Sequence, residues 1–170
     1  VLGKAIASFS GVKRRFQLTG TWNGVGIFDD YGHHPVEIAA VLKAARGGAR
    51  GRIIAVVEPH RYTRVRDLFG EFCAALRDAD SVVVAPLYSA GETPIEGIDN
   101  RSLAEGIRST GHPSVLAVDR ASDIAPVLRR LADPGDMVIF LGAGTSTEWA
   151  QSMPAELAAG DPHRTAGAAE

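Results

Sequence analysis

The densest group of chemically reactive side chains lies in residues 29–35, which read Asp-Asp-Tyr-Gly-His-His-Pro. The segment brings two carboxylates, a phenol and two imidazoles together, and its proline suits the first turn of a helix. A single Asp would be enough to cap that helix, so the additional polar groups favour contact with a ligand. Adjacent His and Asp can also bind a metal. However, the segment has no Glu-x-x-His spacing and no Cys ligand, so we expect no dedicated metal site.

A second cluster, His-Arg-Tyr-Thr-Arg, occupies residues 60–64. Arg61 and Arg64 are three residues apart, so they would project from one face if a helix has begun there. The start of a helix would add exposed N–H groups and the positive end of its dipole. Because the guanidinium fork matches a carboxylate, the pattern predicts an anion site. The alternative is a solvated basic face whose arginines pair with Asp67 and Glu71.

A glycine-rich turn, Gly-Ala-Gly-Thr-Ser, follows an apolar run at residues 142–146. It resembles the start of a dinucleotide-binding turn, but position 147 is Thr instead of the third glycine. No strand-helix-strand unit with an acidic ribose-binding residue follows it. We therefore expect these glycines to allow close backbone packing beside the last strand.

The elements that must position these groups alternate along the chain between apolar runs and helical patterns. Two short strands are expected at residues 15–18 and 24–28. Four apolar runs without polar alternation then predict strands covered on both faces, at residues 53–57, 82–87, 115–118 and 137–141. Helices are expected at about residues 35–46, 65–78, 101–109 and 121–131. This alternation predicts an α/β fold, a Rossmann-like open, mostly parallel sheet flanked by helices on both faces. All the polar clusters follow strands, where open sheets bind ligands.

Length and composition suit one domain with a small partner. The chain has 170 residues, of which 45% are hydrophobic, and a formal net charge of −2. This charge gives no overall attraction to nucleic acid or to an anionic membrane. No apolar run is long enough to cross a bilayer and no signal peptide is evident, so we expect a cytoplasmic protein. The single cysteine, Cys73, lies among apolar neighbours and is expected to be a buried thiol.

Four motifs, taken in order, resemble the C-terminal domain of the Mur ligase family, over about residues 9–157. They are Phe-Ser-Gly-Val-Lys-Arg-Arg-Phe at 9–16, the segment 29–35, Pro-His-Arg-Tyr-Thr-Arg at 59–64, and Gly-Ala-Gly at 142–144. Among these ligases, the chain is most similar to the member that joins L-alanine to UDP-N-acetylmuramate in peptidoglycan precursor synthesis. The resemblance implies that residues 1–8 are a linker from a missing central domain. Residues 158–170 are expected to be a disordered tail.

The resemblance implies a three-domain enzyme in which ATP phosphorylates the muramate carboxylate. The amine of L-alanine then attacks the acyl phosphate. ATP and magnesium would be held mainly by the missing central domain, and UDP-N-acetylmuramate by the missing N-terminal domain. This domain would supply amino-acid contacts and part of the ATP contacts, and would be inactive alone. Carried over by position, Asp30 would hold the ATP ribose and Arg15 would approach its phosphates. The residues around the amino acid would be Tyr31, His33, His60, Arg61 and Arg64, with His33 as an orienting group or proton acceptor.

Three positions depart from the family pattern. Val36 stands where Thr is usual, and Glu58 and Val65 stand where Gln and Thr are expected.

Two other functions stay open. A recycling ligase attaches a tripeptide to the same nucleotide, but there a Phe-Ala pair is expected at positions 31 and 32. A non-catalytic nucleotide-binding module of Rossmann type is supported only by the fold and the glycine-rich turn.

Overall fold

A computed structural model describes residues 15–160 and gives them a mixed, mostly parallel sheet. The strand order is β1-β2-β6-β3-β4-β5. Only β1 is antiparallel to its neighbour, and every other pair of adjacent strands is parallel. The strands are β1 (Gln17–Trp22), β2 (Val25–Asp30), β3 (Ile53–Val57), β4 (Ser81–Val84), β5 (Val115–Ala117) and β6 (Met137–Leu141).

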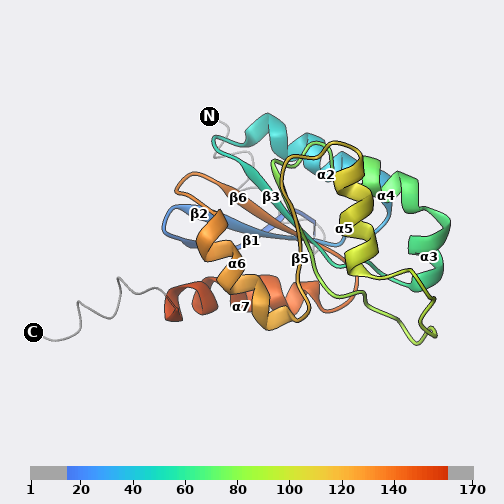
Figure 1. The fold of residues 1–170 in the computed structure, drawn as a ribbon. Helices are drawn as coiled ribbons and strands as arrows, with labels where there is room; N and C mark the ends of the chain where they lie inside the picture. The colour runs from blue at the N-terminus through green and yellow to red at the C-terminus, as the bar shows by residue number, and fades with distance from the viewer. Residues whose placement is uncertain (1–14, 161–170) are drawn as a thin grey trace, which may run out of the picture.

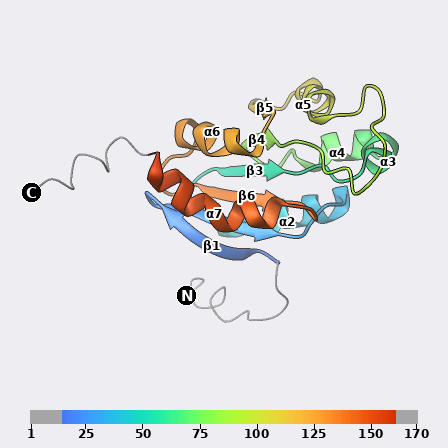
Figure 2. The same ribbon diagram turned by 90° about the horizontal axis from the view of Figure 1, so that it is seen from below.

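Helices cover both faces of this sheet (Figure 1). One layer contains α2 (Pro35–Gly48), α3 (Tyr62–Asp67), α4 (Phe69–Ala75) and α5 (Asn100–Ser109). The other layer contains α6 (Ile124–Leu131), preceded by the 3-10 turn η1 (Ala121–Asp123), and α7 (Ser146–Ala159). Figure 2 shows α7 lying across the sheet on the side of β6 and β1. The α/β class and the helices on both faces are confirmed.

Two apolar cores lie on opposite faces of the sheet because successive strand residues point to opposite sides. In β3, Ala55 and Val57 pack in one core together with Leu42 of α2. Ile54 and Val56 pack in the other core, which also contains residues of α6 and α7. All five residues of β3 are buried. This explains the uninterrupted apolar runs in the sequence.

Several element boundaries differ from the sequence-based expectation. The helix expected at 65–78 is two helices, α3 and α4, that meet at Leu68, whose backbone leaves the helical region. Strand β4 ends at Val84, before Pro86, which has no N–H to donate to a neighbouring strand. Strand β1 begins at Gln17 and continues to Trp22, beyond the expected end at residue 18.

Helix α7 is longer than the glycine-rich turn suggested, and its apolar face was not recognised in the sequence. It buries Ala150, Met153 and Leu157, which have helical spacing, against the sheet. Its last two residues, Ala158 and Ala159, belong to the segment expected to be a tail. The expected linker at 1–8 and the rest of the expected tail, residues 161–170, lie outside the described residues.

Candidate functional site

The predicted clusters meet at the carboxyl edge of the sheet, around the end of β6. Strands β2 and β3 are the two neighbours of β6, and β4 lies next to β3. The chain leaves β2 and β3 toward the α2 and α3 layer, whereas it leaves β6 toward α7 on the opposite face. Open α/β sheets bind ligands in the crevice where neighbouring connections separate in this way. The topology therefore gives this edge a recognised ligand-binding geometry.

The turn after β2 is closed by a histidine cap, so the capping interpretation of the aspartates is wrong. The N-cap of α2 is His34, whose Nδ1 accepts from the N–H of Val36 at 3.5 Å. The Glu37 carboxylate accepts from the N–H groups of His33 and His34, both at 3.1 Å. Although partial burial opposes the shift, these hydrogen bonds lower the pKa of Glu37. Glu37 thus fixes the backbone that carries both histidines.

Asp30 instead ties the turn to the start of β1. Its Oδ1 accepts from the N–H of Gly32 at 2.7 Å, and its Oδ2 accepts from the N–H of Phe16 at 2.8 Å. Burial raises the pKa of this carboxyl, while the two hydrogen bonds and the positive charge of Arg15 oppose the rise. Arg15 and Asp30, both predicted to contact ATP, therefore lie close enough for their charges to interact.

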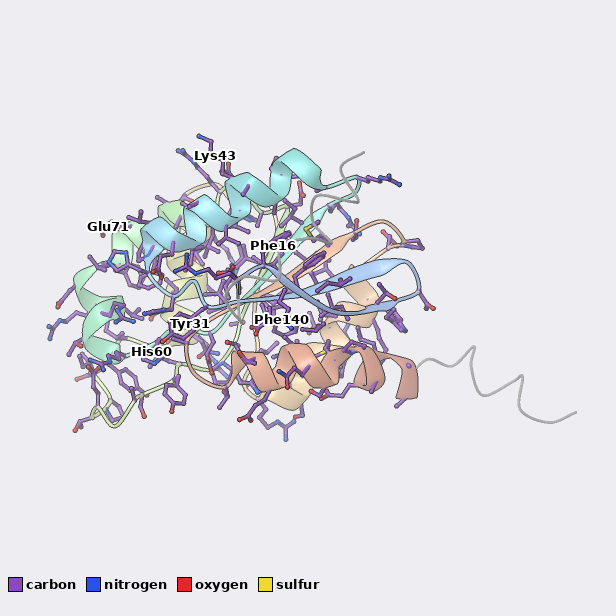
Figure 3. All side chains as sticks on the ribbon, turned by 180° about the vertical axis from the view of Figure 1, so that it is seen from behind. Phe16, Tyr31, Lys43, His60, Glu71 and Phe140 are labelled. Atoms are coloured by element: carbon purple, nitrogen blue, oxygen red, sulfur yellow. The ribbon has the colours of Figure 1, made fainter. Side chains whose placement is uncertain are left out.

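Four rings form a continuous chain across the ends of β2, β3 and β4. The Tyr31 and His33 centroids are 5.0 Å apart, and those of His33 and His60 are 5.6 Å apart. His60 then stacks on Tyr88, with centroids 5.1 Å apart and planes inclined by 19°. Figure 3 shows Tyr31 and His60 at the same end of the sheet. Three of the five residues predicted to surround the amino acid are thus direct neighbours.

Arg64 joins this ring chain through His60. Its Nη1 lies 3.4 Å from His60 Nδ1, and because a guanidinium only donates, Nδ1 is the acceptor. Burial and the nearby charges of Arg64, His33 and Arg61 lower the pKa of His60, against a smaller opposite effect of Glu58. His60 is therefore neutral near pH 7, with its proton on Nε2.

Arg61 has an unusual backbone at the start of α3. It is the N-cap residue with φ of +69°, in the left-handed region that non-glycine residues rarely adopt. Neither Arg61 nor Arg64 forms an ion pair with another residue in the range 15–160. The alternative, in which these arginines pair with Asp67, is wrong, because Asp67 pairs with Arg66 at 2.7 Å. The exposed Arg61 and half-buried Arg64 keep their charge available at this edge.

One part of the predicted anion site needs correction. The N-terminus of α3 does not offer all its N–H groups, because Glu92 already binds there. Its carboxylate accepts from the N–H of Thr63 at 3.0 Å and from the Thr63 hydroxyl at 2.7 Å. Both hydrogen bonds lower the pKa of Glu92. An anion at this place would therefore depend mainly on the Arg61 and Arg64 side chains.

The glycine-rich turn after β6 is also filled from within the protein. Glu58, at the end of β3, is 2% exposed, and its carboxylate accepts four hydrogen bonds at the start of α7. The donors are the N–H groups of Gly144 at 3.0 Å, Thr145 at 2.9 Å and Ser146 at 3.2 Å, and the Thr145 hydroxyl at 2.5 Å. A dinucleotide phosphate would need these same donors. This occupancy argues against the Rossmann-type nucleotide module, and the expected close packing of the glycines is confirmed.

Close packing is visible at both glycines of this turn. A Cβ on Gly142 would lie 2.7 Å from Ser146 Oγ and 2.9 Å from Glu58 Cβ, and a Cβ on Gly144 would lie 2.6 Å from Tyr88 Cγ. Glu58 and Tyr88 were not among the predicted site residues. The sequence signal for Glu58 was its departure from the expected Gln, and that for Tyr88 was its place after a strand.

The three departures from the family pattern lie in different surroundings. Val36 is 73% exposed on α2, whereas Val65 is fully buried in the core beneath α3. Of these three described residues, Glu58 alone contributes its side chain to the hydrogen bonds of this edge. Over residues 15–160, no group of three or more His, Cys, Asp or Glu side chains is placed to hold a metal ion. No helix in that range is long and apolar enough to cross a membrane.

These features define an α/β domain whose carboxyl edge brings the His33 and His60 rings together with Arg61 and Arg64, two arginines that form no ion pair within residues 15–160. Residues 14–144 match the model of the Mur ligase, glutamate ligase domain, and the chain belongs to this family.

The chain is 58% identical over 156 residues to UDP-N-acetylmuramate--L-alanine ligase of Methylobacterium nodulans, a match that covers 92% of the chain and 33% of the relative. It is 60% identical over 159 residues to the enzyme of the same name from Xanthobacter autotrophicus, covering 94% of the chain and 34% of the relative.

Solved structures show the same fold. The UDP-N-acetylmuramate-alanine ligase of Thermotoga maritima superposes with a TM-score of 0.72 at 24% identity, over 93% of this chain and 33% of that one. A domain from a ligase of Haemophilus ducreyi superposes with a TM-score of 0.64 at 24% identity, over 84% of this chain and 99% of that one. The chain thus spans about a third of the length of the curated relatives that it matches.

Proposed function

We propose that this chain is the C-terminal domain of an ATP-dependent ligase that joins L-alanine to the carboxylate of UDP-N-acetylmuramate. The relatives at 58% and 60% identity carry the name of this ligase, and the chain matches a third of their length. ATP and the uridine nucleotide would be bound largely by the rest of the protein, together with magnesium. The reaction would take place in the cytoplasm and would supply a peptidoglycan precursor.

The observation that carries this proposal is a pair of arginines beside a neutral histidine. L-Alanine offers little apolar surface, so its recognition must depend on its carboxylate and its amine. Arg61 and Arg64 supply positive charge without an ion-pair partner among residues 15–160. His60 adds an Nε2–H donor, because its Nδ1 accepts from Arg64. Together these groups suit a carboxylate, which accepts several charge-assisted hydrogen bonds.

His33 has the complementary property that the amine requires. Its Nδ1 lies 2.9 Å from the carbonyl oxygen of Tyr31, and a carbonyl can only accept. Neutral His33 therefore carries its proton on Nδ1, which leaves the lone pair of Nε2 to receive a proton. The amine must lose a proton before it attacks an acyl phosphate, so we assign His33 the role of orienting group or proton acceptor.

Asp30 and Arg15 would contribute to ATP binding. Each carboxylate oxygen of Asp30 keeps a second lone pair after accepting one backbone N–H, and these lone pairs can accept ribose hydroxyls. The exposed guanidinium of Arg15 lies close to this carboxylate and can approach the phosphates. In this proposal the same turn that orders β1 and α2 also contacts the nucleotide.

Gly32 favours the alanine ligase over the tripeptide ligase. Its N–H donates to Asp30 Oδ1, and a Cβ at this position would lie 2.9 Å from that oxygen. The Phe-Ala pair expected of the recycling enzyme would bring this Cβ against the carboxylate. The solved murein peptide ligase of Psychrobacter arcticus is 24% identical to the chain, and that likeness concerns the fold alone.

The test is steady-state kinetics of the full-length protein with L-alanine as the varied substrate. Arg61→Ala or Arg64→Ala removes charge-assisted hydrogen bonds worth about 1.5–3 kcal/mol, so we expect the L-alanine KM to rise about tenfold or more. Arg64→Lys should recover only part of this loss, since an ammonium lacks the planar fork. The matched control is Arg66→Ala, on the same helix, because Arg66 already pairs with Asp67. Equal KM values in the wild type and both site variants would refute the proposed carboxylate site.

A further inference from the structure

Tyr88 contacts two parts of the site that come from different strands. It follows β4 and is 39% exposed. Its ring stacks on the His60 imidazole at a centroid distance of 5.1 Å. The same ring lies so close to Gly144 that a Cβ there would be 2.6 Å from Cγ and 2.7 Å from Cδ2. The ring therefore connects the loop after β3 with the turn after β6.

The backbone of Tyr88 holds the His60 loop as well. Its N–H donates to the carbonyl of Pro59 at 2.8 Å, and its carbonyl accepts from the N–H of Arg61 at 2.8 Å. These two bonds flank His60, which forms an isolated parallel β-bridge with Tyr88. Both the main chain and the ring of Tyr88 thus act on the one residue between Pro59 and Arg61.

Glu58 keeps the other side of the Tyr88 ring in place. Its carboxylate accepts from the N–H of Gly144 at 3.0 Å and, through further bonds, orders the first turn of α7. This bond holds Gly144 in place, and the Tyr88 ring occupies the space where a Cβ of residue 144 would lie. The anchored turn therefore limits how far Tyr88 and His60 can tilt.

We propose that Tyr88 is a positioning residue of the site, whose ring holds the His60 imidazole with Nε2–H directed to the bound amino acid. The identity of that ligand rests on the function proposed above, whereas the packing does not. Besides Tyr88 itself, the charged and titratable groups that act on His60 are Arg61, Arg64, His33 and Glu58. Since burial is the largest cause of the lowered His60 pKa, loss of the Tyr88 ring should raise that pKa.

The direct test follows the His60 imidazole resonances of this chain by NMR across neutral pH, with His60→Gln to assign them. In Tyr88→Ala we expect a downfield shift, because the stacked ring no longer shields the imidazole protons, and a higher pKa. Tyr88→Phe keeps the ring and should match the wild type in both. Unchanged His60 resonances and pKa in folded Tyr88→Ala would overturn the proposal. Equal effects of Tyr88→Phe and Tyr88→Ala would also overturn it, since the hydroxyl and not the ring would then be responsible.

A glycine pair provides a second measurement with a matched control. Gly144→Ala places a methyl group against both the Tyr88 ring and Glu58 Oε2, and should move the His60 resonances through the displaced ring. Gly70→Ala, on α4, adds the same methyl group where no atom outside the surrounding helix backbone lies within 4 Å, and should leave the His60 resonances unchanged. Equal His60 spectra in the two variants would contradict the contact between Gly144, Tyr88 and His60.

Kinetics of the full-length protein separate this inference from the proposed function. Loss of one aromatic stacking contact should raise the L-alanine KM about 2- to 10-fold in Tyr88→Ala, with Tyr88→Phe unchanged. Altered His60 resonances with an unchanged KM would overturn the role of His60 in binding the amino acid. Unaltered resonances would instead overturn the positioning role of Tyr88, whatever the substrate is.

Discussion

Replacing Glu58 by Gln tests how the edge of the sheet is held together. The carboxylate accepts four hydrogen bonds, whereas a Gln side chain has one acceptor oxygen and a donating amide. In the most favourable orientation, the oxygen accepts from Gly144 and Ser146 and the amide donates to the Thr145 hydroxyl. The N–H of Thr145 then faces another donor and loses its acceptor. Gln, the residue expected from the family resemblance, therefore accepts from two of the four donors, while the Thr145 hydroxyl becomes an acceptor.

The expected cost follows from the burial of this site. A buried N–H left without an acceptor costs about 1–3 kcal/mol. Loss of a negative charge at the start of α7 adds about 0.3–1 kcal/mol. Burying an amide costs less than burying a carboxylate, which offsets part of this loss. We expect Glu58→Gln to lower the free energy of unfolding by about 1–3 kcal/mol. In a protein of this length, 2 kcal/mol corresponds to a Tm lower by about 4–8 °C.

Urea unfolding of the chain, followed by circular dichroism, measures this difference. The control is Glu105→Gln, because Glu105 is exposed and its ion pair with Arg108 lies on the surface of α5. Such a pair contributes about 0–1 kcal/mol. The reasoning would be refuted if Glu58→Gln changed the free energy of unfolding by less than about 0.5 kcal/mol and no more than the control. If the slope of the free energy of unfolding against urea concentration is the same in the variant and the wild type, the surface exposed on unfolding is unchanged.

Three further predictions concern other groups. In the full-length protein, Asp30→Ala should lose roughly 1.5–3 kcal/mol of ATP binding and raise the KM for ATP about tenfold or more, a larger rise than in the L-alanine KM. An unchanged ATP KM would remove Asp30 from the nucleotide site. The chain alone should show no ATPase activity in a phosphate-release assay, and release at an ordinary enzymatic rate would contradict the proposal that the phosphate-binding machinery lies elsewhere in the protein. Hydrogen bonds from Arg52 and the backbone lower the pKa of Asp136, although burial of the carboxyl opposes this shift. The ionised carboxylate therefore stabilises the folded chain at pH values above the ordinary pKa of Asp. This stabilisation is lost as the pH falls through the lowered pKa of the folded state. Asp136→Asn should therefore destabilise the chain by about 2 kcal/mol near pH 7 and much less in acid, and a difference independent of pH in urea unfolding would exclude this linkage.

The amino-acid sequence by itself determined the fold class and indicated which segments lie together at one edge of the sheet. Short apolar runs without polar alternation, rich in Val and Ile, predict strands covered on both faces, and β3 and β6 have the predicted bounds. Because parallel strands place their carboxyl ends at one edge, the segments 29–35 and 60–64 were expected to meet, and the His33 and His60 rings do so. These results depend on local composition and on the period of the strand, which a sequence displays directly.

Only the tertiary structure decided which polar groups are free to bind a ligand. Glu58 and Glu92 lie far along the chain from the N–H groups that they accept from, in α7 and α3, so no local pattern could show that both helix starts are occupied. The same holds for Tyr88, whose contacts come from residues 60 and 144. Hydrogen bonds and ring stacking depend on distances of a few ångströms between segments remote in sequence. Those distances are set by the packing of the whole sheet, and the residue types alone do not contain them.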